Sequence, residues 1–211
     1  MRKFTLFLLV GIAAIKARTQ PGSLDKTFGV NGIVKTEYAE KTNAGWETPH
    51  RVLLQKDGKI LIIFEFNGKM IVTRRLSNGQ IDVSYGDQGF SEPIDLKERY
   101  KAAIQDDGKI VAAGASDYAF SAGAHFKVVR INTDGSLDQT FANTGVITTN
   151  LGYQADIPTD VAIQKDGKIL VTGISSSPGA GGVFSLVRYN PNGTLDNTFN
   201  GTGILTTSLN G

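Results

Sequence analysis

The chain has 211 residues, a formal net charge of +2 and no cysteine. Without cysteine the fold cannot be held by disulfides, so it must be stabilised by a packed core. The charge is also too small for the basic surface that nucleic-acid binding requires, and we expect no nucleic-acid partner.

Residues 1–19 have the pattern of a signal peptide. Two basic residues precede an apolar run over residues 4–15, which is shorter than the about 20 residues that cross a bilayer. A buried N-terminal strand is the alternative interpretation. Once residues 1–19 are removed, 18 basic residues remain against 20 acidic ones, and the net charge becomes −2. No second apolar stretch suggests a membrane anchor, so we expect a secreted, periplasmic or cell-surface protein formed by residues 20–211.

A long internal repeat organises the remainder of the chain. Residues 51–63, 101–114 and 160–173 share one apolar pattern around Asp-Gly-Lys, and each is followed by a Gly-x-Leu-Asp-x-Thr-Phe segment or a looser copy of it. The glycines that open this second segment lie at positions 22, 79, 135 and 193, so the spacings are 57, 56 and 58 residues. The repeat divides the chain into units of residues 37–93, 94–149 and 150–207, with a leading partial unit of residues 22–36.

Each unit predicts four antiparallel strands. Two apolar runs flank Asp-Gly, which indicates a type I′ hairpin, because glycine and its neighbour accept the positive φ of that turn. A third strand is expected at residues 70–76, 126–131 and 184–189. A fourth is expected at residues 32–36, 89–93, 145–149 and 203–207. The pattern therefore predicts an all-β, β-propeller-like array of about three complete four-stranded blades plus one extra N-terminal strand, a partial propeller.

Two linked motifs also resemble a known family. The run from Ile163 to Gly173, followed by the run from Leu186 to Phe199, is similar to the delta-60 repeat, and the likeness extends over residues 20–211. That resemblance implies a bacterial β-propeller repeat domain of unassigned function that is frequent in secreted proteins. In the first full unit, a short loop at residues 66–69 and the pair Ser84-Tyr85 depart from the pattern.

Three blades are fewer than the four to eight that close a usual ring. The alternatives are a fragment, an open arc, or part of a ring that a second copy completes. In each case, apolar surfaces at the two ends of the array should be exposed unless a partner covers them. We therefore expect self-association or completion by missing blades.

The repeated polar residues have a structural interpretation. Aspartates of the Gly-x-Leu-Asp segment can accept hydrogen bonds from nearby amides, and each lies eight residues after an arginine with which it can pair. A ring of arginines that binds carboxylate or phosphate is the alternative. The repeated residues expected to build the blades are Asp25, Asp82, Asp138, Asp196, Arg74, Arg130, Arg188, Gly58, Gly108 and Gly167.

No cofactor and no metal are expected. Calcium at the turns is the alternative, because Asn132, Asp134 and Asp138 have the spacing of oxygen ligands, but the turns lack the further carboxylates and the terminal glutamate of an EF-hand-type loop. The usual hydrolase, metalloprotease and phosphate-loop motifs do not occur, which favours a protein that is not an enzyme. The unrepeated acids Glu40, Glu47, Asp117 and Asp156 leave room for a carboxylate pair of the kind found in glycosidases.

Strand direction predicts where a ligand binds. Turns between first and second strands, and between third and fourth strands, must lie on one side of the array. The other side must carry the links between units, at residues 37–50, 94–100 and 150–159, and the loops between second and third strands, at residues 64–69, 115–125 and 174–183. That second side carries the individual residues Tyr38, Trp46, His50, Tyr100, Tyr118, Phe120, His125 and Tyr153. Because loops on a rigid scaffold commonly carry recognition, we expect a non-enzymatic binding or scaffold module for a protein or glycan ligand. A secreted carbohydrate-active or other hydrolytic enzyme, and a structural assembly segment of a larger surface propeller protein, are the alternatives.

Overall fold

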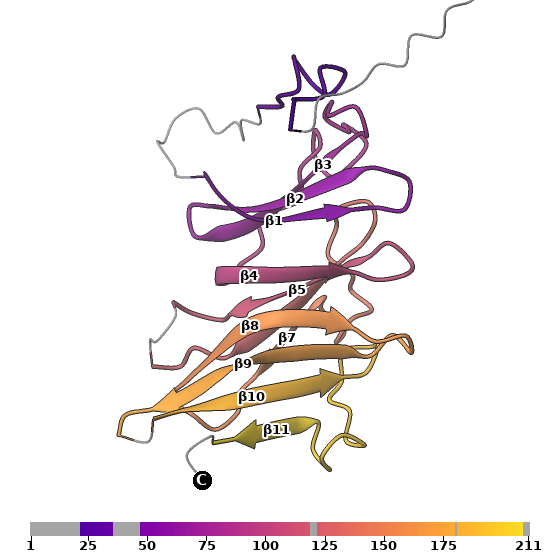
Figure 1. The fold of residues 1–211 in the computed structure, drawn as a ribbon. Coiled ribbons are helices and arrows are strands. Elements are labelled where there is room, and N and C mark those ends of the chain that lie inside the picture. The colour runs from indigo at the N-terminus through magenta and orange to yellow at the C-terminus, as the bar shows by residue number, and fades with distance from the viewer. Residues whose placement is uncertain (1–21, 36–46, 119–121, 180, 209–211) are drawn as a thin grey trace, which may run out of the picture.

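The computed structural model describes residues 22–35, 47–118, 122–179 and 181–208, and over these residues it contains strands, turns and loops but no helix. Three antiparallel sheets follow one another along the chain and are stacked from first to third (Figure 1). The described residues accordingly contain no helix that could cross a membrane. The structure therefore has the all-β architecture that the sequence predicted, and this architecture is consistent with a partial propeller.

The strands of each sheet are consecutive in sequence and in space. The first sheet contains β1 (Glu47–Leu54), β2 (Ile60–Phe66) and β3 (Lys69–Arg75). The second contains β4 (Lys97–Ile104), β5 (Ile110–Ala115), β6 (Phe126–Ile131) and β7 (Val146–Thr149). The third contains β8 (Ala155–Ile163), β9 (Ile169–Ser177), β10 (Gly181–Tyr189) and β11 (Ile204–Thr207). Every pairing within these sheets is antiparallel, so each sheet is a meander that one repeat unit forms.

The Asp-Gly-Lys hairpins have a different turn type from the one predicted. In the first, the Gly58 amide donates to the Gln55 carbonyl at 2.9 Å, and the Gln55 amide donates to the Lys59 carbonyl at 2.8 Å. Only Gly58 has a positive φ, of 81°, whereas a type I′ turn requires positive φ at two residues. The loop is therefore a type I turn closed by a left-handed glycine. The same geometry recurs at Gly108 and Gly167.

The first strands begin earlier than the sequence suggested. Residues 94–100 and 150–159, predicted as links, include the starts of β4 and β8, and β1 likewise takes in the last residues of the predicted link 37–50. Each of these strands carries a register shift near its start, for example between Pro158 and Asp160 of β8. At the shift the first strand has extra residues without a partner on the second strand, and the alternation of apolar residues in a single strand does not reveal this.

The fourth strand is incomplete in the first sheet. Residues 89–93 form no strand, and only bridges between Thr73 and Phe90 and between Met70 and Ile94 remain. The Ser91 hydroxyl accepts from the Val72 amide at 3.0 Å, in the place of a ladder carbonyl, and Pro93 has no amide to donate. A side-chain oxygen and a proline thus interrupt the ladder.

The extra N-terminal strand predicted at residues 32–36 is also absent over its described part. Residues 32–35 make only a bridge between Val30 and Ile33. A fourth strand forms by pairing with the third strand of its own unit, and the described residues contain no such strand before residue 47. The segment of residues 22–35, named here the leading segment, instead lies against the turn at Asn78 of the first unit.

Two apolar cores lie between consecutive sheets. The first packs Leu61, Ile63, Met70 and Val72 against residues of the second sheet such as Ile110 and Val129. The second packs Val111, Phe126, Val128 and Phe141 against residues of the third sheet such as Val171 and Tyr189. The second sheet lies between the other two and therefore buries both of its faces, which explains why β5 is buried at every position.

Candidate functional site

The structure separates two sides of the array, as strand direction predicted. On the turn side, Lys109 of a first hairpin contacts Asp138 of a third-to-fourth turn in the same unit. On the loop side, the loop between β5 and β6 contacts the link before β8, because the Gly123 amide donates to the Gln154 carbonyl at 2.8 Å. Repeated residues are concentrated on the turn side and individual ones on the loop side.

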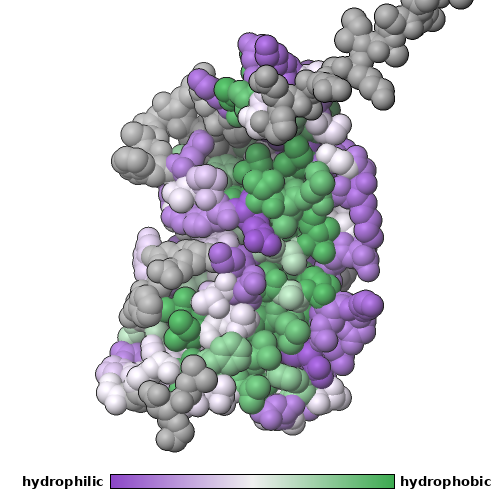
Figure 2. All heavy atoms as spheres, viewed as in Figure 1, coloured by the Kyte–Doolittle hydropathy of each residue, from purple (hydrophilic) through white to green (hydrophobic). Residues whose placement is uncertain are grey.

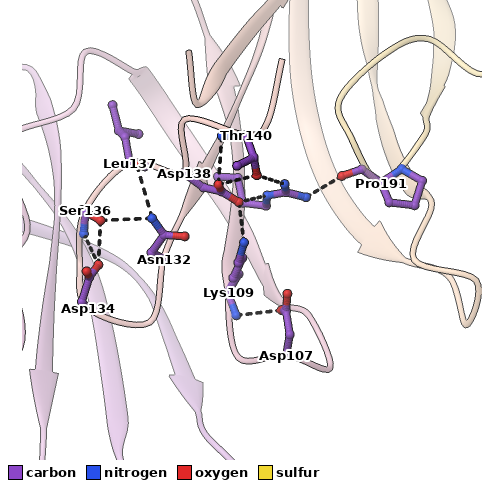
Figure 3. A network of polar contacts seen from close by, with 10 residues as sticks. Asp107, Lys109, Asn132, Asp134, Ser136, Leu137, Asp138, Thr140 and Pro191 are labelled. Carbon is purple, nitrogen blue, oxygen red and sulfur yellow. Dashed lines mark hydrogen bonds and ion pairs between the residues drawn. The ribbon is translucent and has the colours of Figure 1, made fainter. Parts of the chain in front are cut away.

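A charged network recurs on the turn side, and its second copy is drawn in Figure 3. Arg130 Nε donates to Asp138 Oδ2 at 2.6 Å, and Lys109 Nζ donates to the same oxygen at 2.7 Å. The other oxygen, Oδ1, accepts from the Thr140 amide and hydroxyl at 3.1 and 2.6 Å. Equivalent networks are formed by Lys59, Arg74, Asp82 and Ser84 in the first unit and by Lys168, Arg188, Asp196 and Thr198 in the third.

These contacts stabilise the charged form of each aspartate. The Ser84 hydroxyl is the largest influence on Asp82, and with Arg74 and Lys59 it outweighs burial and lowers the pKa of Asp82 to about 2. Burial would raise the pKa of Asp138, but hydrogen bonds from Lys109 and Thr140 hold it well below its usual range. The Thr198 hydroxyl acts in the same direction on the pKa of Asp196. These acids are therefore engaged in the fold rather than available for proton transfer near neutral pH.

The repeated arginine also connects consecutive units. Arg74 Nη1 donates to the Thr133 carbonyl of the next unit at 2.6 Å, and Arg130 Nη1 donates to the Pro191 carbonyl in the same way. The guanidinium lies 4.6 Å from the ring centre of Tyr85 in the first unit and 4.7 Å from that of Phe141 in the second. The arginine therefore contacts its own aspartate, its own aromatic ring and a neighbouring turn at once.

The turn side also contains a cleft of about 480 Å³ between the first two units. Its lining includes the repeated Lys59 and Asp57, the exposed pair Lys56 and Asp106, and Arg74. Lys56 Nζ lies 3.0 Å from Asp106 Oδ1, so charges across this cleft already face one another. The cleft is lined by hairpins of the repeat, and its lysines and Arg74 are each paired with an aspartate.

The loop side has a histidine–aspartate pair whose two residues are not part of the repeat. His125 Nδ1 lies 3.2 Å from Asp156 Oδ2, which also accepts from the Leu151 amide at 3.0 Å. The Asp156 side chain is completely buried, whereas that of His125 is 22% exposed. The His125 amide donates to Ser116 Oγ at 3.0 Å, which fixes the backbone that carries the ring. The imidazole is thus oriented by a buried carboxylate and remains accessible from one side.

A second cleft opens beside this pair. It has a volume of about 320 Å³ and is lined by Gln154, Ala155, Ser176, Ser177 and Pro178. The Gln154 amide donates to Ser177 Oγ at 3.1 Å, which joins the link to the following loop. This cleft lies within the individual part of the chain.

Tyr118 forms a further feature of the loop side. Tyr118 is 57% exposed, and Lys97 Nζ lies 5.7 Å from the centre of its ring. The same ammonium group is held by Asp95 at 2.8 Å and donates to the Gly68 carbonyl at 3.2 Å. An exposed aromatic ring beside an anchored cation can stack on a planar or sugar-like surface.

His50 and Tyr100 have more internal positions than predicted. Tyr100 is fully buried in the core between the first two sheets, so it is a packing residue and not part of an exposed face. It lies within the register-shifted start of β4, where alternation no longer tells which side a residue faces. His50 packs edge-on against Tyr100 and lies 3.7 Å from Glu65, and burial lowers the pKa of His50.

The other residues predicted on the loop side are partly exposed or lie outside the described part of the chain. Tyr153 is partly exposed. Tyr38, Trp46 and Phe120 lie outside the described residues, as does Glu40. Sequence reasoning missed Lys97, Asp95 and Glu65, which contact predicted residues from neighbouring strands and links. Of these, Glu65 could have been found by pairing β1 with β2 across the Asp-Gly-Lys hairpin, because its partner Thr48 is two residues from His50.

A metal site finds no support in the described part of the chain. No group of three histidine, aspartate or glutamate side chains there is arranged to hold a metal ion. At the turn of Asn132, Asp134 and Asp138, which is the alternative calcium site, Asp134 Oδ1 accepts from the Ser136 amide and hydroxyl at 2.9 and 2.7 Å. The turn aspartates thus have protein donors as partners.

Comparison with known proteins is consistent with this architecture. Residues 105–141 and 164–199 match a family described as "Domain of unknown function (DUF5122) beta-propeller". Both matched segments run from an Asp-Gly-Lys hairpin to the end of the following Leu-Asp-x-Thr-Phe segment. No curated protein matches the chain. The two segments are thus similar to a β-propeller domain whose function is unassigned.

Proposed function

We propose that the chain is an exported, non-enzymatic binding or scaffold module that recognises a protein or glycan ligand on its loop side. The three sheets supply a rigid support, and the loop side supplies side chains that differ from unit to unit. The protein would act in the periplasm, at the cell surface or outside the cell. The proposed site comprises His125 with Asp156, the neighbouring cleft, and Tyr118 with Lys97.

One contrast supports this proposal. On the turn side, equivalent lysines, arginines and aspartates satisfy one another in all three units. On the loop side, Tyr118 and His125 are exposed or partly exposed, and each is anchored by residues that have no counterpart in other units. Side chains that are individual, accessible and fixed in position are what specific recognition requires.

The pair of His125 and Asp156 also favours a second candidate, a hydrolytic enzyme. A buried aspartate that orients a histidine is half of a Ser-His-Asp triad. A triad further requires a nucleophile beside the second ring nitrogen. Within the described residues, the ring of His125 makes its one hydrogen bond to Asp156, so this candidate ranks second.

An array screen tests the proposal. The whole chain is applied to glycan and peptide arrays, and the bound molecules are then incubated with it and analysed by mass spectrometry for cleavage. We expect binding without cleavage, with loss of binding in His125→Ala or Tyr118→Ala. Cleavage that His125→Ala abolishes would instead favour the hydrolase, and the absence of any bound glycan or peptide would contradict a recognition module.

A further inference from the structure

The junctions between consecutive sheets use the same set of contacts twice. The Gly86 amide donates to the Asp134 carbonyl of the next unit at 2.7 Å, and the Ala142 amide donates to the Asn192 carbonyl at 2.8 Å. Beside each bond, the repeated arginine donates to the preceding carbonyl of the same turn, that of Thr133 or Pro191. A junction therefore includes two parallel donations from one unit to the turn of the next.

An aromatic ring completes the outer part of each junction. Tyr85 lies so close to Gly135 that a Cβ on that glycine would be 3.1 Å from the ring, and Phe141 approaches Gly193 within 2.9 Å by the same measure. The turn glycine is thus needed for close approach as well as for its positive φ. The aromatic ring, the arginine and one amide all point from a unit toward its successor.

The inner part of each junction is apolar. Met70 of β3 and Phe126 of β6 hold equivalent positions, four residues before the repeated arginine, and both are 0% exposed because the next sheet covers them. On the receiving side, Ala102 and Val161 hold equivalent positions in β4 and β8 and are 1% and 7% exposed. At each junction the donating face and the receiving face therefore pack together as parts of one apolar core.

The third unit presents the donating face, and none of the described residues covers it. Phe184, the counterpart of Met70 and Phe126, is 43% exposed. Arg188 is held by Asp196 and lies 4.7 Å from the ring centre of Phe199, but its Nη1 has no acceptor among the described residues. Asn200, with a φ of 49°, repeats the left-handed geometry of Ala142, and its backbone amide likewise has no acceptor among the described residues. The third unit thus presents the same donating groups that the first and second units use at the internal junctions.

The first unit presents the receiving face, which is only partly covered. Val52, the counterpart of Ala102 and Val161, is 64% exposed, and Leu54 is 70% exposed. In Figure 2 a hydrophobic band begins in the region of β1 and runs down the molecule across the other two sheets, with hydrophilic turns along its right edge. The molecule therefore carries two unlike open faces of the kinds that meet inside it.

The leading segment covers the outer part of the receiving face as a substitute for a full unit. Its Gly29 amide donates to the Asn78 carbonyl at 2.9 Å, and Phe28 approaches Gly79 as Phe141 approaches Gly193. It lacks the other contacts of a junction. Asp25 is bonded to Thr27 and to no arginine among the described residues, and Leu24 and Val30 are 60% and 77% exposed. A segment held by so few contacts can be displaced by one that makes them all.

We propose that two copies of this chain associate head to tail. The face of the third unit, with Phe184, Arg188 and Asn200, binds the first unit of a second copy, where it displaces the leading segment and covers Val52 and Leu54. Arg188 Nη1 and the Asn200 amide then donate to the carbonyls of Ser77 and Asn78, as their counterparts do at the internal junctions. The contact is heterologous, so each copy uses both faces, and two copies supply six sheets, within the range of closed propellers.

Complementation between two variants tests this pairing. Val52→Lys introduces a charge on the receiving face only, and Phe184→Lys does so on the donating face only. Val83→Lys is the matched control, because Val83 is 61% exposed on a turn outside both faces. Sedimentation velocity of the whole chain should give a dimer for the wild type and for Val83→Lys, and monomers for Val52→Lys and Phe184→Lys separately. An equimolar mixture of those two variants retains one intact face of each kind and should regain a dimer.

Two results would overturn the proposal. One is a wild-type chain that stays monomeric at concentrations up to several hundred micromolar. The other is a dimer that survives both lysine variants, or that the mixture fails to restore, because an isologous contact gives no complementation. Circular dichroism of each variant shows whether it is folded, and Phe184→Leu, which preserves apolar character, should retain the dimer.

Discussion

Arg130 and Pro191 join two consecutive units of the chain, because the Arg130 guanidinium donates through Nη1 to the Pro191 carbonyl while its Nε holds Asp138 of its own unit. The arginine is 7% exposed and the aspartate 2%. Because both side chains are buried, the loss of one partner leaves the other charge uncompensated.

The pair should therefore be coupled in a thermodynamic cycle. We expect Arg130→Ala and Asp138→Ala each to lower the free energy of unfolding by about 1–3 kcal/mol, and the double variant to lose less than the sum. Urea denaturation of the four proteins provides the cycle. Strict additivity would mean that the two side chains do not interact in solution.

The position of the arginine in the array should also matter. Arg188 makes the same contacts within its unit as Arg130, but no described residue accepts from its Nη1. At concentrations where the chain is monomeric, we expect Arg188→Ala to destabilise the protein less than Arg130→Ala, since only the latter also loses a contact between units. Equal losses in urea denaturation would contradict a role for this arginine at the junction.

Acid should weaken the network on the turn side. The pKa of Asp82 falls from its ordinary value of 3.8 to about 2, and those of Asp138 and Asp196 are lowered too. A lowered pKa in the folded state contributes stability that is complete above the unfolded-state pKa and is lost as the pH falls through the folded-state value. We therefore expect the free energy of unfolding to decrease between about pH 4 and about pH 2.

Urea denaturation at several values in this pH window measures that decrease. Asp82→Asn should be less stable at pH 6 and should show a shallower decline, since one of the responsible carboxylates is gone. Stability that is constant or rises as the pH falls from 4 to 2 would contradict the assignment.

A glycine at the second junction should resist substitution. Gly173 of β9 does not have a positive φ, but a Cβ there would lie 2.2 Å from the Ile157 carbonyl oxygen and 2.5 Å from the Phe126 ring. We expect Gly173→Ala to destabilise the protein by about 1–3 kcal/mol because the core is overpacked. Gly182→Ala in β10 is the control, since its nearest neighbour is an Ile174 methyl group at 3.3 Å. Similar melting temperatures for the two variants would show that the junction is looser than described.

Much of the fold could be predicted because it repeats. The apolar pattern that recurs between units predicts strands at residues 126–131 and 184–189, which correspond to β6 and to the greater part of β10 (Gly181–Tyr189), and the eight-residue spacing of Arg130 and Asp138 predicts their contact. Repetition reveals contacts that every unit makes, because each copy is an independent instance of the same local rule.

Other features depend on relations that the pattern within one unit does not contain. The sequence predicts Tyr100 on the exposed loop side, but the residue is buried in the core, because it lies within the register shift of β4. The bond from Arg130 to Pro191 spans 61 residues and uses a backbone carbonyl, which has no signature in the sequence. The pairing of His125 with Asp156 likewise depends on how two irregular loops approach one another.

The separation of a structural turn side from a recognising loop side is tested most directly by a dissociation constant. For a ligand found on the arrays, isothermal titration calorimetry compares the whole chain with Tyr118→Ala on the loop side and Lys56→Ala on the turn side. Lys56 is exposed and lines the turn-side cleft, so its removal leaves the buried network intact. We predict at least a tenfold weaker affinity for Tyr118→Ala and an unchanged affinity for Lys56→Ala. The reverse pattern would contradict the account and place recognition on the turn side.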